Sequence, residues 1–343
     1  MTNSLQTIRQ KRIAVFKANK RGYYSSWIFL FLFIFTLFSE FIANDKPLLI
    51  SYKNEFYAPI FKVYAETTFG GEFESEADYK DEYVQELISK NGYAIWPIIR
   101  YSYHTIKSDS DIPFPSPPSN ENLLGTDDQG RDVFARLMYG FRISVLFGLT
   151  LTIFSSIIGV IAGAIQGYYG GKIDLLGQRF IEIWGGLPTL FLLLILVNYI
   201  EPTFWWLLGL LLLFSWTSLV GVVRAEFLRA RNFEYVKAAK ALGQSDKNII
   251  IKHILPNALI STVTFMPFIL TGSITTLTSL DFLGFGLPAG SASLGELLAQ
   301  GKANLHAPWL GISAFVVLSA LLTLLIFVGE ALRDALDPRI AQK

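Results

Sequence analysis

The amino-acid sequence predicts an all-α integral membrane protein with six transmembrane helices. Of its 343 residues, 52% are hydrophobic and only 17% are charged, whereas globular domains carry about 25% charged residues. The mean hydropathy is +0.40. Most importantly, the charges are spread unevenly, and six stretches are close to the roughly 20 apolar residues that cross a bilayer.

The predicted spans follow one another along most of the chain. In order, they are residues 26–43, 144–165, 186–200, 204–223, 258–280 and 309–329. The first follows a basic region, but no small-x-small cleavage pattern follows it, so we interpret it as an uncleaved anchor. The third contains Pro188 near its start, and its helix is expected to begin earlier, around Arg179 and Glu182.

The flanking charges predict the orientation of these spans. Residues 1–24 contain basic side chains and no acid, and residues 224–257 contain more basic than acidic side chains. In residues 44–142 the acids outnumber the bases. Because lysine and arginine gather on the cytoplasmic side, we expect both termini to lie in the cytoplasm of a multi-pass inner-membrane protein.

This topology divides the chain into four parts. They are the N-terminus with the first span (1–43), a periplasmic insert (44–121), a core with five spans and the cytoplasmic loop 224–257 (122–337), and a C-terminal tail (338–343). The insert is rich in tyrosine, proline and acids, and Pro113 to Pro118 predicts a stiff connector. Two roles stay open for it: a docking or gating surface, or a passive lid.

The loop 224–257 contains the most informative pattern, because residues 233–257 read as helix, break and helix. Gly243 suits the left-handed turn that ends a helix, and Ser245 is a candidate N-cap for the next one. The small residues Ala238, Ala239 and Ala241 would let another protein approach the first helix closely. The alternative is an ordinary basic hairpin beside lipid headgroups.

A second pattern precedes the second span. Apolar residues recur there at helical spacing, namely Val133, Phe134, Leu137, Met138 and Phe141. This periodicity predicts an amphipathic helix that lies along the outer face of the membrane.

Several activities are excluded by the sequence. The chain has no cysteine and only three scattered histidines, His104, His253 and His306, which argues against a metal site. The glycine-rich run 167–172 lacks the spacing and the Ser or Thr of a phosphate-binding loop, and no Gly-x-Ser-x-Gly elbow is present. We therefore predict a subunit without catalysis, cofactor or metal. Spans two to six also lack internal charges, which disfavours an ion-coupled transporter.

The run Ala238-Ala239-x3-Gly243-x11-Leu255-Pro256 resembles the coupling-loop signature of bacterial ABC importer permeases, which have the MetI-like fold. Lys237 and His253 depart from the general signature, but His-Ile-Leu-Pro-Asn at 253–257 is typical of the dipeptide, oligopeptide and nickel branch. The blocks 124–144, 167–174 and 279–288 are similar to the same branch. The resemblance spans about 122–337, and it extends to the N-terminal region within a subgroup of peptide and microcin C importers.

The resemblance implies a permease that moves oligopeptides, peptide antibiotics such as microcin C among them, while a separate ATPase subunit hydrolyses ATP. It implies three partners: a homologous second permease, a cytoplasmic ABC ATPase and a periplasmic peptide-binding protein. The residues expected to couple to the ATPase are Tyr235, Ala238, Ala239, Gly243, His253, Leu255 and Pro256. A nickel or other solute permease of the same family, an ion-coupled secondary transporter and a non-transporting scaffold are the alternatives.

Overall fold

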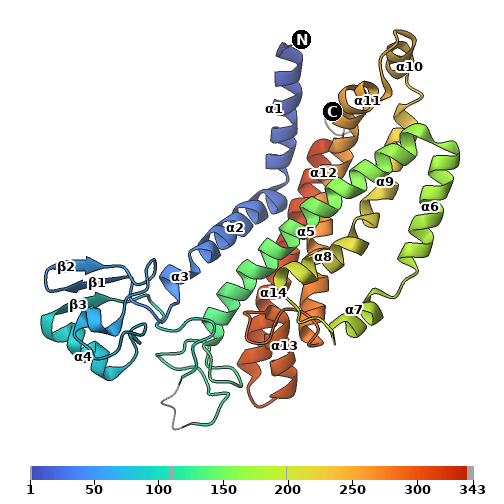
Figure 1. Ribbon diagram of the computed structural model, residues 1–343. Coiled ribbons are helices and arrows are strands. Elements are labelled where there is room, and N and C mark those ends of the chain that lie inside the picture. Colours follow the sequence, from blue (N-terminus) through green and yellow to red (C-terminus); the bar gives the residue numbers. More distant parts are fainter. Residues whose placement is uncertain (1, 108–111, 198, 338–343) are drawn as a thin grey trace.

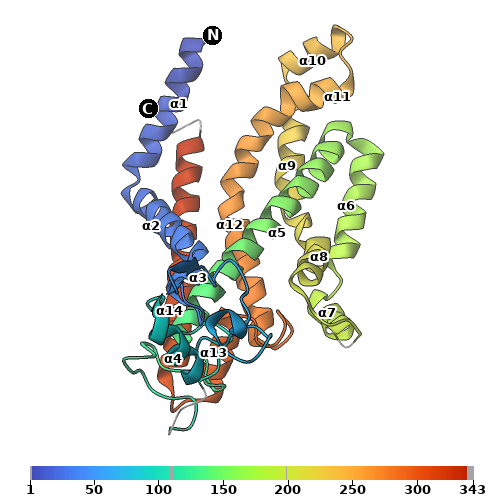
Figure 2. The same cartoon turned by 60° about the vertical axis from the view of Figure 1, so that its left-hand side comes forward.

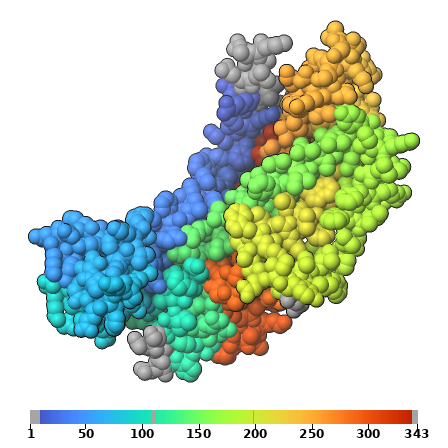
Figure 3. Space-filling view, viewed as in Figure 1, coloured from blue at the N-terminus to red at the C-terminus, as the bar shows by residue number. Residues whose placement is uncertain are grey.

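The computed structural model describes residues 2–107, 112–197 and 199–337 and consists mostly of long helices (Figure 1). A small lobe of strands and short helices projects from the helical part (Figure 3). The all-α prediction is therefore wrong for this lobe, which lies within the predicted insert. The predicted tail 338–343 lies outside the described residues.

The elements fall into an N-terminal part with the insert, and a helical core. The first group comprises α1 (Thr2–Ala18), α2 (Lys20–Leu37), α3 (Ser39–Ile42), β1 (Leu49–Tyr52), β2 (Glu55–Tyr57), the 3-10 turn η1 (Glu66–Phe69), α4 (Glu82–Asn91) and β3 (Gly92–Ile95). The core comprises α5 (Val133–Tyr169), α6 (Gly171–Gly185), α7 (Thr189–Val197), α8 (Phe204–Ser215), α9 (Thr217–Ala230), α10 (Glu234–Ala241), α11 (Asp246–Asn248), the π-turn η2 (Ile249–Ile254), α12 (Leu255–Phe282), α13 (Leu294–Ala303) and α14 (Pro308–Leu336).

Among the described residues, four helical runs are long and apolar enough to cross a membrane. They are Val133–Tyr169, Phe204–Ala230, Asp246–Phe282 and Pro308–Leu336, and they contain the predicted spans 144–165, 204–223, 258–280 and 309–329. The first predicted span falls on α2 and α3, which are not among these runs, so it stays a prediction.

The third predicted span is not one straight helix. The structure divides the region into α6 and α7, which are bent by 58° and would make a fifth crossing if they are counted together. The break follows Gly185 and Gly186 and includes Pro188, whose nitrogen cannot donate a helical hydrogen bond. The expectation that the helix begins before residue 186 agrees with α6, which starts at Gly171.

The long helices α5 and α9 pack closely because glycines line their contact (Figure 2). A Cβ at Gly159, Gly163 or Gly167 would lie 2.6–2.8 Å from the carbonyl oxygens of Trp216, Val220 and Arg224, respectively. These glycines recur every four residues on one face of α5. Small residues at this spacing allow two helix backbones to approach where side chains would otherwise separate them.

The predicted amphipathic surface helix is wrong. Residues 133–141 are the first turns of α5, which begins after Asp132 and continues to Tyr169 without interruption. The apolar side chains of Val133, Leu137 and Phe141 are buried inside the protein rather than facing lipid. Val133 and Leu137 pack against residues of α13 and α14.

An ion cluster holds the start of α5 to α13. The fully buried Arg136 donates from Nη2 to Glu296 Oε2 at 2.8 Å and to the carbonyl of Ser291 at 2.8 Å. Arg131 donates to the other Glu296 oxygen at 2.9 Å and to Asp127 at 2.7 Å. Burial of both arginines makes this pairing necessary, because an unpaired guanidinium there would lose its hydration without compensation.

The cap of α5 adjoins this cluster. Asp132 Oδ1 accepts the amide of Ala135 at 2.7 Å, and its Oδ2 accepts the side-chain amide of Asn122 at 2.8 Å. Burial raises the pKa of the Asp132 carboxyl, and these two hydrogen bonds oppose the rise. The cap therefore fixes where α5 begins.

The insert has a core of its own. Its antiparallel sheet has the order β2-β1-β3, with Ile50 opposite Tyr57 on one side and opposite Ala94 on the other. Phe69 is fully buried and its ring contacts four tyrosine rings, those of Tyr52, Tyr57, Tyr64 and Tyr79. These contacts between aromatic rings stabilise the small lobe.

The insert leaves and rejoins the helical part at one place. Ile99 donates its amide to the carbonyl of Ile42 at 2.9 Å, and Asn44 donates to the carbonyl of Ile99 at 3.1 Å. The residues after Ile99 run back along the core, where Ile106 forms a bridge to Arg131. This narrow neck connects the lobe to the end of α3.

Candidate functional site

The hairpin, residues 233–257, lies at one end of the helical core, at the end opposite the insert (Figures 1 and 2). Its first helix is α10, and its second part runs through α11 and η2 into α12. The predicted sequence of helix, break and helix is confirmed. The hairpin therefore continues directly into a membrane-spanning helix.

Gly243 makes the break between the two helices. Its φ is +76°, and its amide donates to the carbonyl of Lys240 at 3.0 Å, while Gln244 donates to Ala239 at 3.1 Å. This pair of hydrogen bonds is the Schellman arrangement, in which a left-handed residue satisfies the last carbonyls of a helix. The predicted left-handed glycine is confirmed.

Ser245 occupies the N-cap position of α11 but makes no side-chain capping hydrogen bond. The predicted N-cap position is therefore confirmed, although the hydroxyl does not satisfy a helix amide. A different side chain fastens this end, because the hydroxyl of Tyr168 on α5 donates to Asp246 Oδ1 at 2.6 Å. An acidic residue in the first turn of a helix is itself favourable toward the helix dipole.

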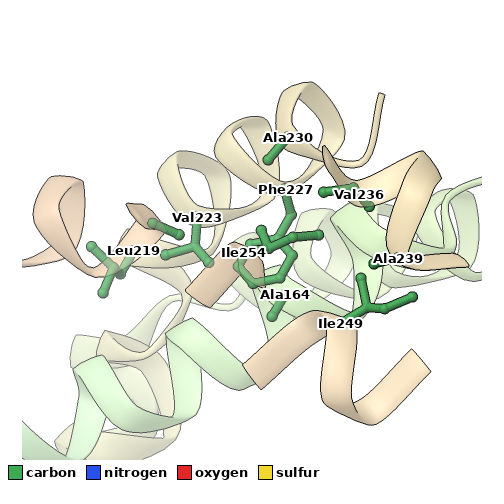
Figure 4. Close-up of a cluster of buried hydrophobic side chains, with 10 residues drawn as sticks. Ala164, Leu219, Val223, Phe227, Ala230, Val236, Ala239, Ile249 and Ile254 are labelled. Atoms are coloured by element: carbon green, nitrogen blue, oxygen red, sulfur yellow. The ribbon is translucent and has the colours of Figure 1, made fainter. Parts of the chain in front are cut away.

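One face of α10 packs inward. Val236 and Ala239 are buried and join a cluster with Phe227 of α9 and Ile249 and Ile254 of η2 (Figure 4). Val236 and Ala239 are three residues apart, so they share one side of the helix. This cluster packs the hairpin against α9 and the start of α12.

Polar contacts reinforce the attachment. Arg231, just before the hairpin, donates to the carbonyl of Tyr168 at 3.3 Å. On the neighbouring helix α9, Arg224 donates through two nitrogens to the carboxylate of Asp174 on α6, with Nη2 at 2.7 Å from Oδ2. The corner between α5 and α6 is thus bound to α9 and to the hairpin.

The other face of α10 points outward, and it has a stripe of apolar and small side chains flanked by the exposed charges of Glu234, Lys237 and Lys240. Tyr235 is 42% exposed and Leu242 is 81% exposed. Ala238 and Ala241 are exposed beside them. A short helix with this surface can enter a groove of a partner protein and bury its apolar side chains there.

The structure separates the seven predicted coupling residues into three groups. Tyr235, Ala238 and Gly243 are exposed on the outer side of the hairpin, whereas Ala239 is only 5% exposed and packs against the hairpin's own core. The expectation that Ala239 presents a small surface to a partner is therefore wrong, because Ala239 is the small residue that lets α10 lie close to η2. The remaining three residues, His253, Leu255 and Pro256, lie at the junction with α12.

Each residue of the junction has a distinct environment. His253 Nε2 and Gln244 Oε1 are 2.7 Å apart, a contact that closes the hairpin. Leu255 is half-buried and packs against the hydrophobic cluster. Pro256 is exposed in the first turn of α12, where a missing amide hydrogen is tolerated.

Sequence reasoning missed Leu242, the most exposed apolar side chain of the hairpin. Its position directly before the helix-ending glycine was the available signal, since that position lies at the tip of the turn. In the part of the chain that the structure describes, no group of three or more potential metal-ligating side chains lies close enough to hold an ion.

Long apolar helices, one of them continuous with an exposed hairpin, are the features of a membrane-embedded helical protein. The family model for the binding-protein-dependent transport system inner membrane component matches residues 141–342. The chain belongs to this family.

Two similar proteins span nearly the whole chain. The inner membrane ABC transporter permease protein YejE of Escherichia coli K12 is 60% identical over 98% of this chain and 99% of its own length. The peptidoglycan transport system permease protein YejE of Agrobacterium fabrum is 57% identical over 96% of this chain and 93% of its own length. The expected resemblance to a subgroup that includes the N-terminal region is confirmed.

More distant relatives match a smaller share of the chain. The oligopeptide transport system permease protein OppC of Lactococcus lactis is 36% identical over 66% of this chain and 79% of its own length. A solved chain of the MetNI methionine ABC transporter in an inward-facing conformation has a TM-score of 0.50 at 17% identity. It covers 58% of this chain and 96% of that chain, and it supports the MetI-like fold alone.

Proposed function

We propose that the chain is the permease subunit of an ABC importer that moves oligopeptides across the inner membrane, driven by a separate ATPase. The observation behind this proposal is the hairpin, whose exposed stripe of Tyr235, Ala238 and Leu242 lies on a helix that packs against α9 and α12. The names of the similar proteins, which include oligopeptide and peptidoglycan transport, support a peptide substrate.

We propose a topology of six crossings, with both termini and the hairpin in the cytoplasm and the insert in the periplasm. Helix α2 has 18 residues, which corresponds to about 27 Å, close to the roughly 30 Å of a hydrocarbon core. The N-terminal end of α1 and the hairpin lie at one end of the molecule, and the insert and α13 lie at the other (Figure 1). This arrangement supports the orientation predicted from the flanking charges, and the division at 43, 121 and 337 stays a prediction.

The hairpin is the proposed contact with the ATPase. Tyr235, Ala238 and Leu242 would enter a groove of that subunit, while Gly243 sets the turn that presents them. Ala239, His253, Leu255 and Pro256 would act from inside, by holding α10 against the start of α12. Closure of the ATPase would then pull α10 and move α12 with it, which converts nucleotide binding into rearrangement of the helices.

The remaining proposed partners follow from this role. One is a homologous second permease that completes the pathway, and the other is a periplasmic binding protein that delivers the peptide. In this arrangement the ATPase hydrolyses ATP, and the chain itself catalyses no reaction. Microcin C as one of the substrates stays a prediction.

Uptake of labelled short peptides tests the proposal. Cells with and without the chain are compared while the proton gradient is collapsed and ATP is maintained. Uptake that depends on the chain and persists under these conditions is expected. Loss of uptake on collapse would indicate an ion-coupled transporter, and uptake that never depends on the chain would indicate nickel, another solute or a scaffold role.

A further inference from the structure

The exposed face in the outer half of α12 differs chemically from the exposed faces of α5 and α14. On α5 the exposed side chains include Ile153, Phe154 and Ile157, and on α14 they include Ile312 and Phe315. Such side chains suit a lipid environment. On α12, by contrast, the exposed residues of the outer half are Gly272, Thr275, Thr276 and Ser279. Hydroxyl groups on α12 thus occupy a surface that is apolar on α5 and α14.

This face lines three cavities along α12. Thr276 lines a cavity of about 580 Å³ whose other side consists of residues from α7, α8 and α9, and Thr189, Ser215 and Ser218 are among them. Thr275 and Ser279 line two adjoining cavities of about 290 Å³ and 230 Å³. A cavity of several hundred cubic ångströms matches the size of sites for small organic ligands.

The hydroxyl groups are arranged to accept hydrogen bonds. Thr275, Thr276 and Ser279 each donate to the carbonyl four residues earlier on α12, at 2.8–2.9 Å. Their hydroxyl protons are thereby engaged, and the oxygen lone pairs remain for a donor in the cavity. These oxygens can accept hydrogen bonds from N–H groups of a passing molecule.

Two further hydroxyls in these walls have unused hydrogen-bonding capacity. Ser215 Oγ, in the wall of the largest of the three cavities, and Thr278 Oγ1, in an adjoining one, are buried and have no partner among the described residues. Thr278 is only 5% exposed. A buried hydroxyl without a partner is unfavourable, and a ligand or ordered water relieves the cost.

No charged side chain contributes to this surface. The sequence of α12 between Asn257 and Leu280 contains no Asp, Glu, Lys, Arg or His, and the residues that line the three cavities are all uncharged. Fixed charges in a pathway favour solutes of the opposite sign and retain them. A neutral wall with hydroxyl groups has no such preference.

We propose that the Thr275–Thr276–Ser279 face of α12 forms a wall of the substrate route and contacts peptides through their main-chain amides. This inference rests on the proposed function. Because every peptide has the same N–H and C=O groups, such a wall passes peptides without regard to the charge of their side chains. Thr276, which borders two of the three cavities, is the central residue of this wall.

The absence of cysteine from the chain makes water access to this face directly measurable. In the complete transporter, Thr276→Cys is expected to react with a membrane-impermeant maleimide, and saturating peptide is expected to slow the reaction. The matched control is Thr150→Cys on α5, where the native hydroxyl also bonds its own helix and the exposed neighbours Leu146 and Ile153 are apolar. The control is expected to stay unlabelled.

Two results would overturn the assignment of the route. One is a Thr276→Cys variant that transports peptide but remains unlabelled with and without nucleotide. The other is efficient cross-linking of Thr276→Cys to the second permease, which would make this face a subunit interface. If the wild type takes up no peptide while Thr276→Cys is labelled, the peptide substrate is wrong, whereas the water-filled route stands.

A charge at position 276 tests the lack of charge selection. Thr276→Asp is expected to slow uptake of acidic peptides by about tenfold relative to basic peptides, because a fixed charge in the wall of a pathway repels solutes of the same sign. Thr276→Lys is expected to show the reverse preference, and Thr276→Asn to show none. Equal slowing of acidic and basic peptides by both charged variants would contradict the proposal.

Discussion

Arg136 and Glu296 are 160 residues apart in the sequence, yet Arg136 Nη2 donates to Glu296 Oε2 at 2.8 Å. The Arg136 side chain is fully shielded from solvent at this site. Glu296 also accepts from Arg131, so this carboxylate bridges two buried guanidinium groups, and Asp127 is the second acid of the cluster. This pairing fixes α13 against the start of α5 and shapes the end of the molecule next to the insert.

Glu296→Ala is expected to destabilise the protein by about 3–5 kcal/mol, because it leaves two buried arginines with Asp127 as their one remaining carboxylate. Glu296→Gln, which keeps hydrogen-bond acceptance, is expected to cost less. Thermal unfolding of the purified protein in detergent measures both. The control is Glu182→Ala, since Glu182 and its partner Arg179 are largely exposed, and such pairs contribute below about 1 kcal/mol. Equal losses of stability in Glu296→Ala and Glu182→Ala would contradict the role of burial.

Gly243→Val is expected to leave membrane insertion intact and to abolish the ATP hydrolysis that a substrate-loaded binding protein stimulates. A left-handed conformation disfavours a residue with a Cβ by about 1–2 kcal/mol, so the turn that presents α10 would be lost. Gly290→Val is the matched control, because Gly290 has a φ of +86° and open space around it but lies far from the hairpin in sequence. Normal stimulation in Gly243→Val would rule out the coupling role.

Gly163→Val is expected to separate α5 from α9. A Cβ there would lie 2.8 Å from the carbonyl of Val220 and 2.8 Å from the Cβ of Val223, and overpacking of this kind costs about 1–3 kcal/mol. Gly221→Val, at a position on α9 with open space around it, should have a smaller effect. Thermal unfolding and the level of each variant in the membrane measure the difference. A larger loss of stability in Gly221→Val than in Gly163→Val would disprove the packing argument.

Phe69→Ala is expected to unfold the insert while the helical core stays folded. The ring of Phe69 is fully buried among four tyrosines, and loss of such a side chain costs about 3–5 kcal/mol. Limited proteolysis should then cut within residues 45–98 and spare the core. Phe73→Ala serves as the control, since that ring is 63% exposed. Cleavage throughout both parts would show that the insert has no independent core.

Removal of the insert tests whether it has a role in transport. Replacement of residues 46–97 by a short Gly-Ser linker keeps the neck at Ile42 and Ile99. Loss of uptake at an unchanged protein level is expected if the insert docks the binding protein or gates the pathway. Unchanged uptake would assign it the role of a passive lid.

The membrane-spanning helices of the core were largely predictable, because long apolar runs leave few alternatives to a helix in lipid. The turn at Gly243 was also predictable, since only glycine adopts its conformation readily. The sheet of the insert was missed because its strands have only three or four residues and β1 lacks clear alternation in sequence.

Other features depend on tertiary contacts that local sequence does not contain. Helical periodicity around Val133 and Leu137 is the same whether the apolar face meets lipid or protein, and here it meets α13 and α14. Likewise, Ala238 and Ala239 are identical in type, but only the second faces the core. The glycine repeat at 159, 163 and 167 was visible in the sequence and would have predicted the close contact of α5 with another helix.

The neck at Ile42 and Ile99 also determines how easily the lobe could be exchanged for another segment. Because the two ends are hydrogen-bonded to each other, they are close enough for a loop of a few residues to join them. The entropy of closing a longer connection rises only slowly with its length. A folded module of almost any size can therefore be exchanged at this point without shifting the helices, so natural variation in the size of this region need not alter the transport machinery beneath it.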